Sequence, residues 1–164
     1  MVKPAAPEAR LHQMLAAAPS FTIATAESCS GGEVAHRITS VAGSSAYFLG
    51  GIVAYANDAK RSLLGVPQDV LDTVGAVSDP CARALAEGAR TAFGADYAVS
   101  TTGIAGPGGA TARKPVGLVY IAVAGPDGTE CREHRFPGER GAVIDAAAGA
   151  ALRLLVDRIE AARR

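Results

Sequence analysis

The feature that most constrains the fold is an alternation of short apolar runs with segments of helical periodicity. Residues 21–25, 50–55, 97–101 and 116–124 form apolar, β-prone runs, and most of the stretches between them repeat apolar residues at helical spacing. Buried strands separated by helices build a sheet that is covered on both faces. The turn Gly125-Pro126-Asp127-Gly128 leads back into a last, more polar strand and predicts a hairpin at the sheet's outer edge. The pattern therefore predicts an α/β fold with a mixed sheet.

Helix limits follow from capping residues and from glycine and proline. Ser78-Asp79-Pro80 is a strong helix start, because Ser accepts a free amide hydrogen and Pro is tolerated in the first turn. The expected helices are residues 11–18 (ended by Pro19-Ser20), 32–41, one capped by Asn57 or Asp58, one from Ser78, and one from near Glu139.

Length and charge limit the classes of protein that fit. A chain of 164 residues has the size of one domain, which we expect to span residues 1–164 with a disordered lead over about residues 1–6. Sixteen basic residues balance 16 acidic ones, which argues against nucleic acid or an anionic membrane as partner. No apolar run approaches the length of a membrane span, and no signal segment is evident. We therefore expect a soluble, cytoplasmic protein.

Cysteine and histidine show no metal-binding pattern. The chain has three cysteines without CxxC spacing and three isolated histidines. We expect no metal and no cofactor.

Three segments rich in small or polar residues follow predicted strands, at residues 26–32, 55–60 and 102–109. In sheets of this kind, ligands bind where strand ends and their loops converge. These segments form the candidate site.

Ser28 lies in a turn of small residues between a strand and a helix. A hydroxyl placed there is exposed, and free N–H groups at the helix start could stabilise an oxyanion beside it. The competing interpretation is that Ser28 or Ser30 is a helix N-cap, the commonest role of Ser before a helix. Cys29 is a rival nucleophile, although a cysteine among small residues is more often inert.

Lys60 falls in the first turn of a predicted helix, where the helix dipole disfavours a positive charge. Burial there would lower its pKa and provide a neutral amine as general base. The alternative is a solvated surface lysine. Tyr55 ends the preceding strand and could relay a proton, or it could be a half-buried packing ring.

The loop at residues 102–109 holds four glycines and one proline, so its backbone N–H groups could approach an anion. It matches no phosphate-binding fingerprint, and an ordinary flexible turn explains it equally well. Arg140 stands in the first turn of the last helix, again against the dipole, which suggests an anion as ligand, although an ordinary exposed arginine is the slightly favoured interpretation.

Six segments, in this order, resemble the CinA C-terminal domain family. They are Ala26-Glu27-Ser28-Cys29-Ser30-Gly31-Gly32, Gly43-Ser44-Ser45, Tyr55 to Lys60, Gly75-Ala76-Val77-Ser78, Gly103-Ile104-Ala105-Gly106-Pro107 and Lys114-Pro115-Val116-Gly117. The resemblance runs from about residue 8 to residue 158. This family includes stand-alone nicotinamide-nucleotide amidases, also called NMN deamidases.

The resemblance implies a three-layer α/β/α sandwich with a mixed, mostly parallel sheet and a metal-free serine amidase. It places the nucleophile on Ser28, the general base on Lys60 and an assisting hydroxyl on Tyr55. It places substrate-binding positions on Ser30, Gly31, Gly32, Thr102, Gly103, Ile104, Ala105 and Arg140. The expected reaction converts nicotinamide mononucleotide to nicotinate mononucleotide and ammonia.

Two further expectations accompany the resemblance. The chain lacks the N-terminal domain with pyrophosphatase activity that many relatives carry, so we assign no such activity, and we expect a homo-oligomer, a dimer or trimer. The competing function is a non-catalytic nucleotide-binding or regulatory module of the competence- or damage-inducible type.

Overall fold

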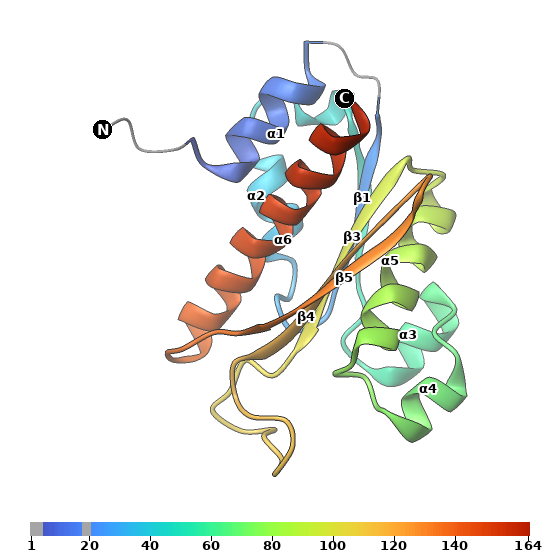
Figure 1. Cartoon of the computed structure of the whole chain (residues 1–164), viewed down its shortest axis with the longest axis vertical. Helices are drawn as coiled ribbons and strands as arrows, with labels where there is room; N and C mark the ends of the chain where they lie inside the picture. The colour runs from blue at the N-terminus through green and yellow to red at the C-terminus, as the bar shows by residue number, and fades with distance from the viewer. Residues whose placement is uncertain (1–4, 18–20) are drawn as a thin grey trace.

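The computed structural model describes residues 5–17 and 21–164 (Figure 1). The expected end of the first helix at Pro19-Ser20, and all but the end of the expected disordered lead, lie outside the described residues. The elements are α1 (Pro7–Leu15), β1 (Ile23–Glu27), α2 (Glu33–Thr39), the 3-10 helix η1 (Ser44–Ala46), β2 (Phe48–Val53), α3 (Asn57–Leu64), α4 (Gln68–Thr73), α5 (Asp79–Phe93), β3 (Tyr97–Gly103), β4 (Leu118–Gly125), β5 (Gly128–Arg135) and α6 (Arg140–Ala162).

The five strands form one sheet in the order β2-β1-β3-β4-β5. β1 pairs in parallel with β2 and β3, whereas β3–β4 and β4–β5 are antiparallel. The predicted mixed sheet is confirmed, as is the hairpin, in which Gly125 pairs with Gly128. The sheet is divided evenly between the two pairings rather than being mostly parallel. The reason is that residues 104–117 form a loop and not a crossover helix, so β4 returns beside β3 in the opposite direction.

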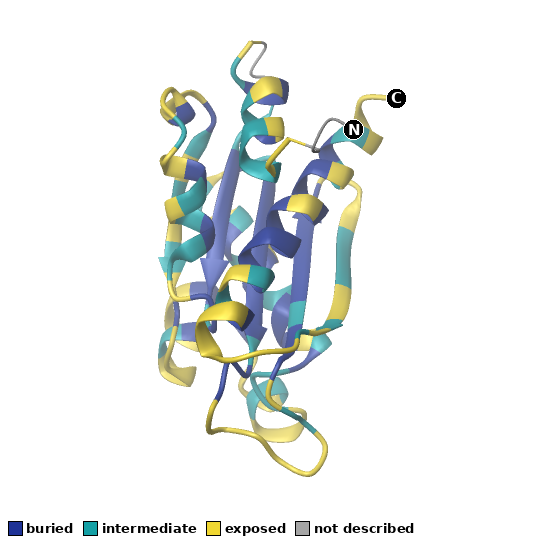
Figure 2. Cartoon of the chain, turned by 90° about the vertical axis from the view of Figure 1, so that its left-hand side faces the viewer, coloured by how far each residue is buried: buried dark blue, intermediate teal, exposed yellow. Residues whose placement is uncertain are grey.

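Helices cover both faces of the sheet, which confirms the three-layer sandwich (Figure 1). The first layer, α1, α2 and α6, packs over one face in a core that includes Leu11, Ile38 and Leu152. The second layer, α3, α4 and α5, covers the other face through residues such as Leu85. The central strands are buried between these layers (Figure 2). β5 is the half-exposed edge strand that its mixed polarity predicts.

The predicted helix starts are confirmed at Ser78 and Glu139 and corrected at Asn57. Ser78 is the N-cap of α5, and its hydroxyl oxygen accepts from the Cys81 N–H. Glu139 is the N-cap of α6. The N-cap of α3 is Ala56, with no side-chain cap, so neither Asn57 nor Asp58 caps it. Asn57 is instead the first helical residue.

Two short elements, α4 and η1, were not predicted. α4 spans six residues, too few for apolar periodicity to establish a helix, and none of them is fully buried. Among the described residues, no helix is long and apolar enough to cross a membrane.

The helix that carries Lys60 is held tightly against its neighbour. A Cβ placed on Gly88 of α5 would lie 2.0 Å from the carbonyl oxygen of Leu64 at the end of α3. Only glycine allows this backbone contact. The contact fixes α3, and with it Lys60, against the body of the protein.

Candidate functional site

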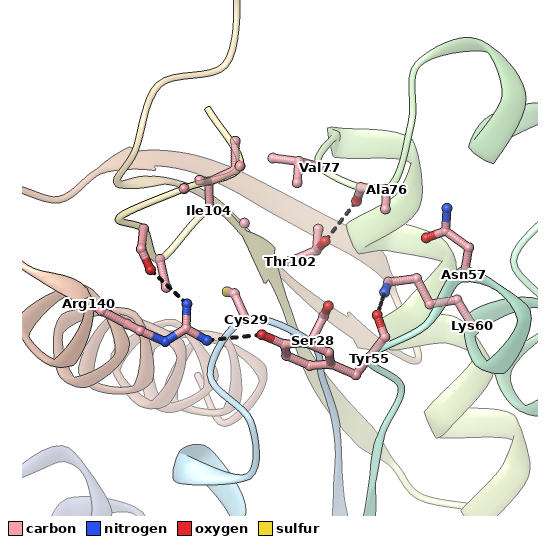
Figure 3. A pocket seen from close by; sticks show the side chains of 15 residues that line it. Ser28, Cys29, Tyr55, Asn57, Lys60, Ala76, Val77, Thr102, Ile104 and Arg140 are labelled. Carbon is pink, nitrogen blue, oxygen red and sulfur yellow. Dashed lines mark hydrogen bonds between the residues drawn. The ribbon is translucent and has the colours of Figure 1, made fainter. Parts of the chain in front are cut away.

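A cavity of about 270 Å³ opens where β1 and β3 end, between α3, the loop after β3 and the start of α6 (Figure 3). The three segments singled out from the sequence therefore meet in space. The lining consists of Ser28, Cys29, Tyr55, Asn57, Lys60, Ala76, Val77, Thr102, Gly103, Ile104, Ala105, Gly106, Gly108, Gly109 and Arg140.

Ser28 is the first residue after β1, and hydrogen bonds fix its backbone on both sides. Its N–H donates to the Thr101 carbonyl over 3.0 Å, and its carbonyl accepts from the Gly31 N–H over 3.1 Å. The side chain is half-buried and lines the cavity. The N-cap of α2 is Gly32, so the interpretation of Ser28 or Ser30 as the N-cap is wrong.

Ser30, Gly31 and Gly32 do not line the cavity. Ser30 is 3% exposed, and its hydroxyl donates to the Glu27 carboxylate over 2.6 Å. Gly31 and Gly32 have φ values of 60° and 105°, which turn the chain from β1 into α2. These three residues shape the turn that holds Ser28. The resemblance predicted instead that they contact the substrate.

The predicted oxyanion donors at the start of α2 are already engaged. The N–H groups of Val34 and Ala35 donate to the two oxygens of Glu27, over 2.8 and 3.0 Å. In the part of the chain that the structure describes, the N–H groups of Cys29 and Ser30 donate to no backbone carbonyl. The amides available to an oxyanion are therefore those directly after Ser28.

Lys60 is buried, at 2% exposure, and its Nζ donates to the Tyr55 carbonyl over 2.9 Å. Burial lowers the pKa of its amine, as the sequence predicted. The Lys60 amine and the Ser28 hydroxyl border the same cavity (Figure 3), although no direct hydrogen bond joins these two described side chains. The interpretation of Lys60 as a solvated surface lysine is wrong.

Cys29 borders the cavity beside Ser28 but is poorly suited to act as the nucleophile. Burial raises the pKa of its thiol to about 11, so the thiolate is scarce at neutral pH. Cys81, which lies near Lys60 on α5, also has a thiol pKa raised by burial to about 11. The hydroxyl of Ser28 is therefore the better candidate nucleophile.

Arg140 joins the two sides of the cavity. Its Nη2 donates to the Tyr55 hydroxyl over 3.0 Å, and its Nη1 donates to the Gly106 carbonyl over 2.7 Å (Figure 3). Tyr55 is 60% exposed, so it is not a packing ring. Because the arginine supplies the hydrogen of their shared bond, the phenol hydrogen of Tyr55 stays available to another acceptor.

The loop after β3 forms one wall of the cavity. Thr102 is buried, and its hydroxyl donates to the Ala76 carbonyl over 2.7 Å, which brings Ala76 and Val77 into the wall. A Cβ on Gly106, whose φ is +85°, would lie 2.6 Å from Val116 Cγ1, so the loop closes on itself only with glycine there.

The sequence predicted only a capping role for Asn57 and none for Ala76 or Val77, although all three line the cavity. Ala76 and Val77 belong to one of the recognised motifs, but their side chains carry no chemical signal. In the described residues, no group of His, Cys, Asp and Glu is arranged to hold a metal ion.

The comparisons with known proteins agree on one family. The model of the CinA C-terminal domain matches residues 5–159. A CinA-like protein of Geotalea uraniireducens is 58% identical over 120 residues, which is 73% of this chain and 29% of that protein. One from Anaeromyxobacter dehalogenans is 55% identical over 139 residues, or 85% of this chain and 34% of that protein. The chain thus spans about a third of the length of these relatives.

Solved structures match over nearly the whole chain. The competence/damage inducible protein CihA from Agrobacterium tumefaciens has a TM-score of 0.88 and 40% identity, covering 96% of this chain and 98% of that one. The competence damage-inducible protein A from Klebsiella pneumoniae has a TM-score of 0.89 and 31% identity, covering 94% and 95%.

Proposed function

Because the chain belongs to the CinA C-terminal domain family, we propose that it is an amidohydrolase that cleaves the carboxamide of nicotinamide mononucleotide. One observation carries the proposal: a buried lysine amine with a lowered pKa borders the same cavity as a serine hydroxyl at a strand end. This pair fits a serine nucleophile activated by a neutral amine.

In the first step, the neutral Lys60 amine takes the proton of the Ser28 hydroxyl, and Ser28 Oγ bonds to the carboxamide carbon. The amide of Cys29, which lines the cavity, stabilises the oxyanion of the tetrahedral intermediate. The C–N bond then breaks, and the nitrogen leaves as ammonia with a proton from the Lys60 ammonium, relayed by the Tyr55 hydroxyl. Lys60 moves from the Tyr55 carbonyl to Ser28 when substrate binds, since catalytic hydrogen bonds tighten only in the complex.

In the second step, water attacks the acyl-enzyme ester. Lys60 takes a proton from the water, the ester bond to Ser28 breaks, and the serine recovers its hydrogen. The products are nicotinate mononucleotide and a free enzyme, with one water consumed and one ammonia released.

The lining of the cavity fits an anionic substrate. The cavity is lined by two basic side chains, Lys60 and Arg140, and by no Asp or Glu among the described lining residues. We assign Arg140 and the loop at residues 102–109 to the ribose phosphate. Arg140 and Lys60 lie on opposite sides of Ser28 (Figure 3), which leaves the Lys60 end of the cavity to the neutral carboxamide.

Ammonia release from nicotinamide mononucleotide tests the function. We expect activity in the wild type and in the control variants Ser62→Ala and Lys114→Ala, which alter residues outside the cavity. We expect loss of about 10³-fold or more in Ser28→Ala and Lys60→Ala. Activity that survives in Ser28→Ala rules out the nucleophile. Nicotinamide riboside and free nicotinamide show whether the phosphate is read, and we expect both to react more slowly.

A second candidate is a non-catalytic nucleotide-binding or regulatory module. The names of the related structures, competence- or damage-inducible proteins, favour it, as does the absence of a Ser28–Lys60 hydrogen bond in the described residues. Tight binding of nicotinamide mononucleotide without ammonia release would favour this candidate. The homo-oligomeric state and the cytoplasmic location stay predictions.

A further inference from the structure

A buried polar chain lies beneath the Ser28 turn, outside the cavity. Glu27, Ser30 and Thr101 are 1%, 3% and 0% exposed. Ser30 Oγ lies 2.6 Å from Glu27 Oε1 and 2.6 Å from Thr101 Oγ1. A buried carboxylate is costly unless its oxygens are fully hydrogen-bonded, so its retention here requires an explanation.

Counting the available hydrogens shows which group donates in each hydrogen bond of this buried polar chain. The Glu27 oxygens accept from the Val34 N–H, the Ala35 N–H and the Ser30 hydroxyl. Ser30 has one hydroxyl hydrogen, and it is used on Glu27. Thr101 must therefore donate to Ser30, and every hydrogen in the chain points toward the carboxylate. Such a chain has only one arrangement, which makes it rigid.

The hydrogen-bonded chain contacts both residues that follow β1. Thr101, whose carbonyl accepts the Ser28 N–H, is a member of the chain. The Thr101 hydroxyl also makes a hydrogen bond with the Cys29 thiol, on the floor of the cavity. The backbone of Glu27 itself lies in β1, directly before Ser28.

We propose that Glu27 is a positioning residue: through Ser30 and Thr101 its carboxylate holds the Ser28 hydroxyl toward the cavity and fixes the position of the Cys29 side chain. This role rests on the proposed function of Ser28 as nucleophile. It explains why a carboxylate stands at this buried place and what holds the neighbouring cysteine side chain.

Two labelling rates test the role without requiring turnover. A fluorophosphonate reports Ser28, and methyl methanethiosulfonate reports Cys29 in a Cys81→Ala, Cys131→Ala background, where Cys29 is the only thiol. In Glu27→Gln we expect Ser28 labelling to slow by about 10²-fold, as for a nucleophile displaced by about 1 Å. We expect Cys29 labelling to rise about tenfold, since the hydrogen bonds that hold it are broken.

Controls separate positioning from general damage. Glu33→Gln removes the same charge from the same helix start without touching the chain, and both of its rates should equal those of the wild type. Ser30→Ala breaks the chain but leaves the two helix amides on Glu27, so it tests the proposal even when Glu27→Gln does not fold. Ser30→Thr keeps the hydroxyl and should restore most of the Ser28 labelling rate lost in Ser30→Ala.

Rates within twofold of wild type in both Glu27→Gln and Ser30→Ala overturn the proposal. When nicotinamide mononucleotide is hydrolysed, the kcat of Glu27→Gln should fall with KM within about twofold, because the substrate contacts remain. Ammonia release by Ser28→Ala would remove the proposed function, whereas the Cys29 labelling rates would still decide whether Glu27 orders the chain. The two failures are therefore distinguishable.

Discussion

Replacing Lys60 with methionine should abolish hydrolysis and stabilise the fold. Lys60 is 2% exposed, and its amine donates one hydrogen bond among the described residues, to the Tyr55 carbonyl over 2.9 Å. Methionine keeps most of the apolar stem and removes the ammonium. The loss is one hydrogen bond to a charged donor, about 1.5–3 kcal/mol. The variant also avoids the cost of burying an ammonium that has no carboxylate partner, which is several kcal/mol even after relaxation.

The balance favours the variant by about 1–2 kcal/mol at neutral pH, and for a domain of this size about 2–4 °C in Tm corresponds to each kcal/mol. We therefore expect Tm to rise by about 2–8 °C in thermal unfolding followed by circular dichroism. Lys114→Met is the matched control, since Lys114 Nζ also donates to a backbone carbonyl, that of Val74, but at the surface. Its Tm should be unchanged or slightly lower.

The pH dependence gives the sharper test. Burial lowers the pKa of folded Lys60 below its usual 10.5, so between these two pKa values the unfolded chain binds more protons than the folded one. The stability penalty is complete below the folded pKa and vanishes as pH rises to the unfolded value. The advantage of Lys60→Met should therefore shrink between neutral pH and pH 10.5. A Tm that falls in Lys60→Met, with no such pH dependence, would refute the argument that this amine is poised to be neutral.

Three other substitutions give direct tests. Gly88→Ala places a Cβ 2.0 Å from the Leu64 carbonyl oxygen and should destabilise the fold by about 1–3 kcal/mol in urea unfolding; an unchanged midpoint would contradict the close packing of α3 and α5. Thr102→Val leaves the Ala76 carbonyl without its donor and should cost about 1–3 kcal/mol while raising KM, and a KM equal to wild type would argue against its role in the cavity wall. Arg140→Lys keeps the charge but not the forked geometry, so kcat/KM should fall about tenfold; full activity would show that charge alone suffices.

The sequence predicted the elements whose signal is local. Each strand begins within two residues of its apolar or alternating run, and Ser78-Asp79-Pro80 marked the start of α5 because the capping hydroxyl and the proline act within one turn. The convergence of Ser28 and Lys60 also followed, since strand ends of such sheets meet at one edge.

What could not be predicted depends on contacts distant in sequence. Burial makes Lys60 unusual, and its place in the first helical turn, against the dipole, is the one local signal in residues 57–64 that separates it from a surface lysine. Glu27 had no derivable role until Thr101, which comes 74 positions after it, was seen beside Ser30. Arg140 looked like a free cation at a helix start, whereas it is shared between Tyr55 and Gly106.

The isolation of Lys60 from acidic side chains has a consequence for the end of the catalytic cycle. Under the proposed reaction, the substrate presents a neutral amide to this lysine, but the product presents a carboxylate. A protonated Lys60 has no Asp or Glu beside it among the described lining residues. It would therefore form an ion pair with the product carboxylate. Nicotinate mononucleotide should therefore be released slowly and should inhibit the enzyme as a product, and this inhibition should strengthen as the pH falls.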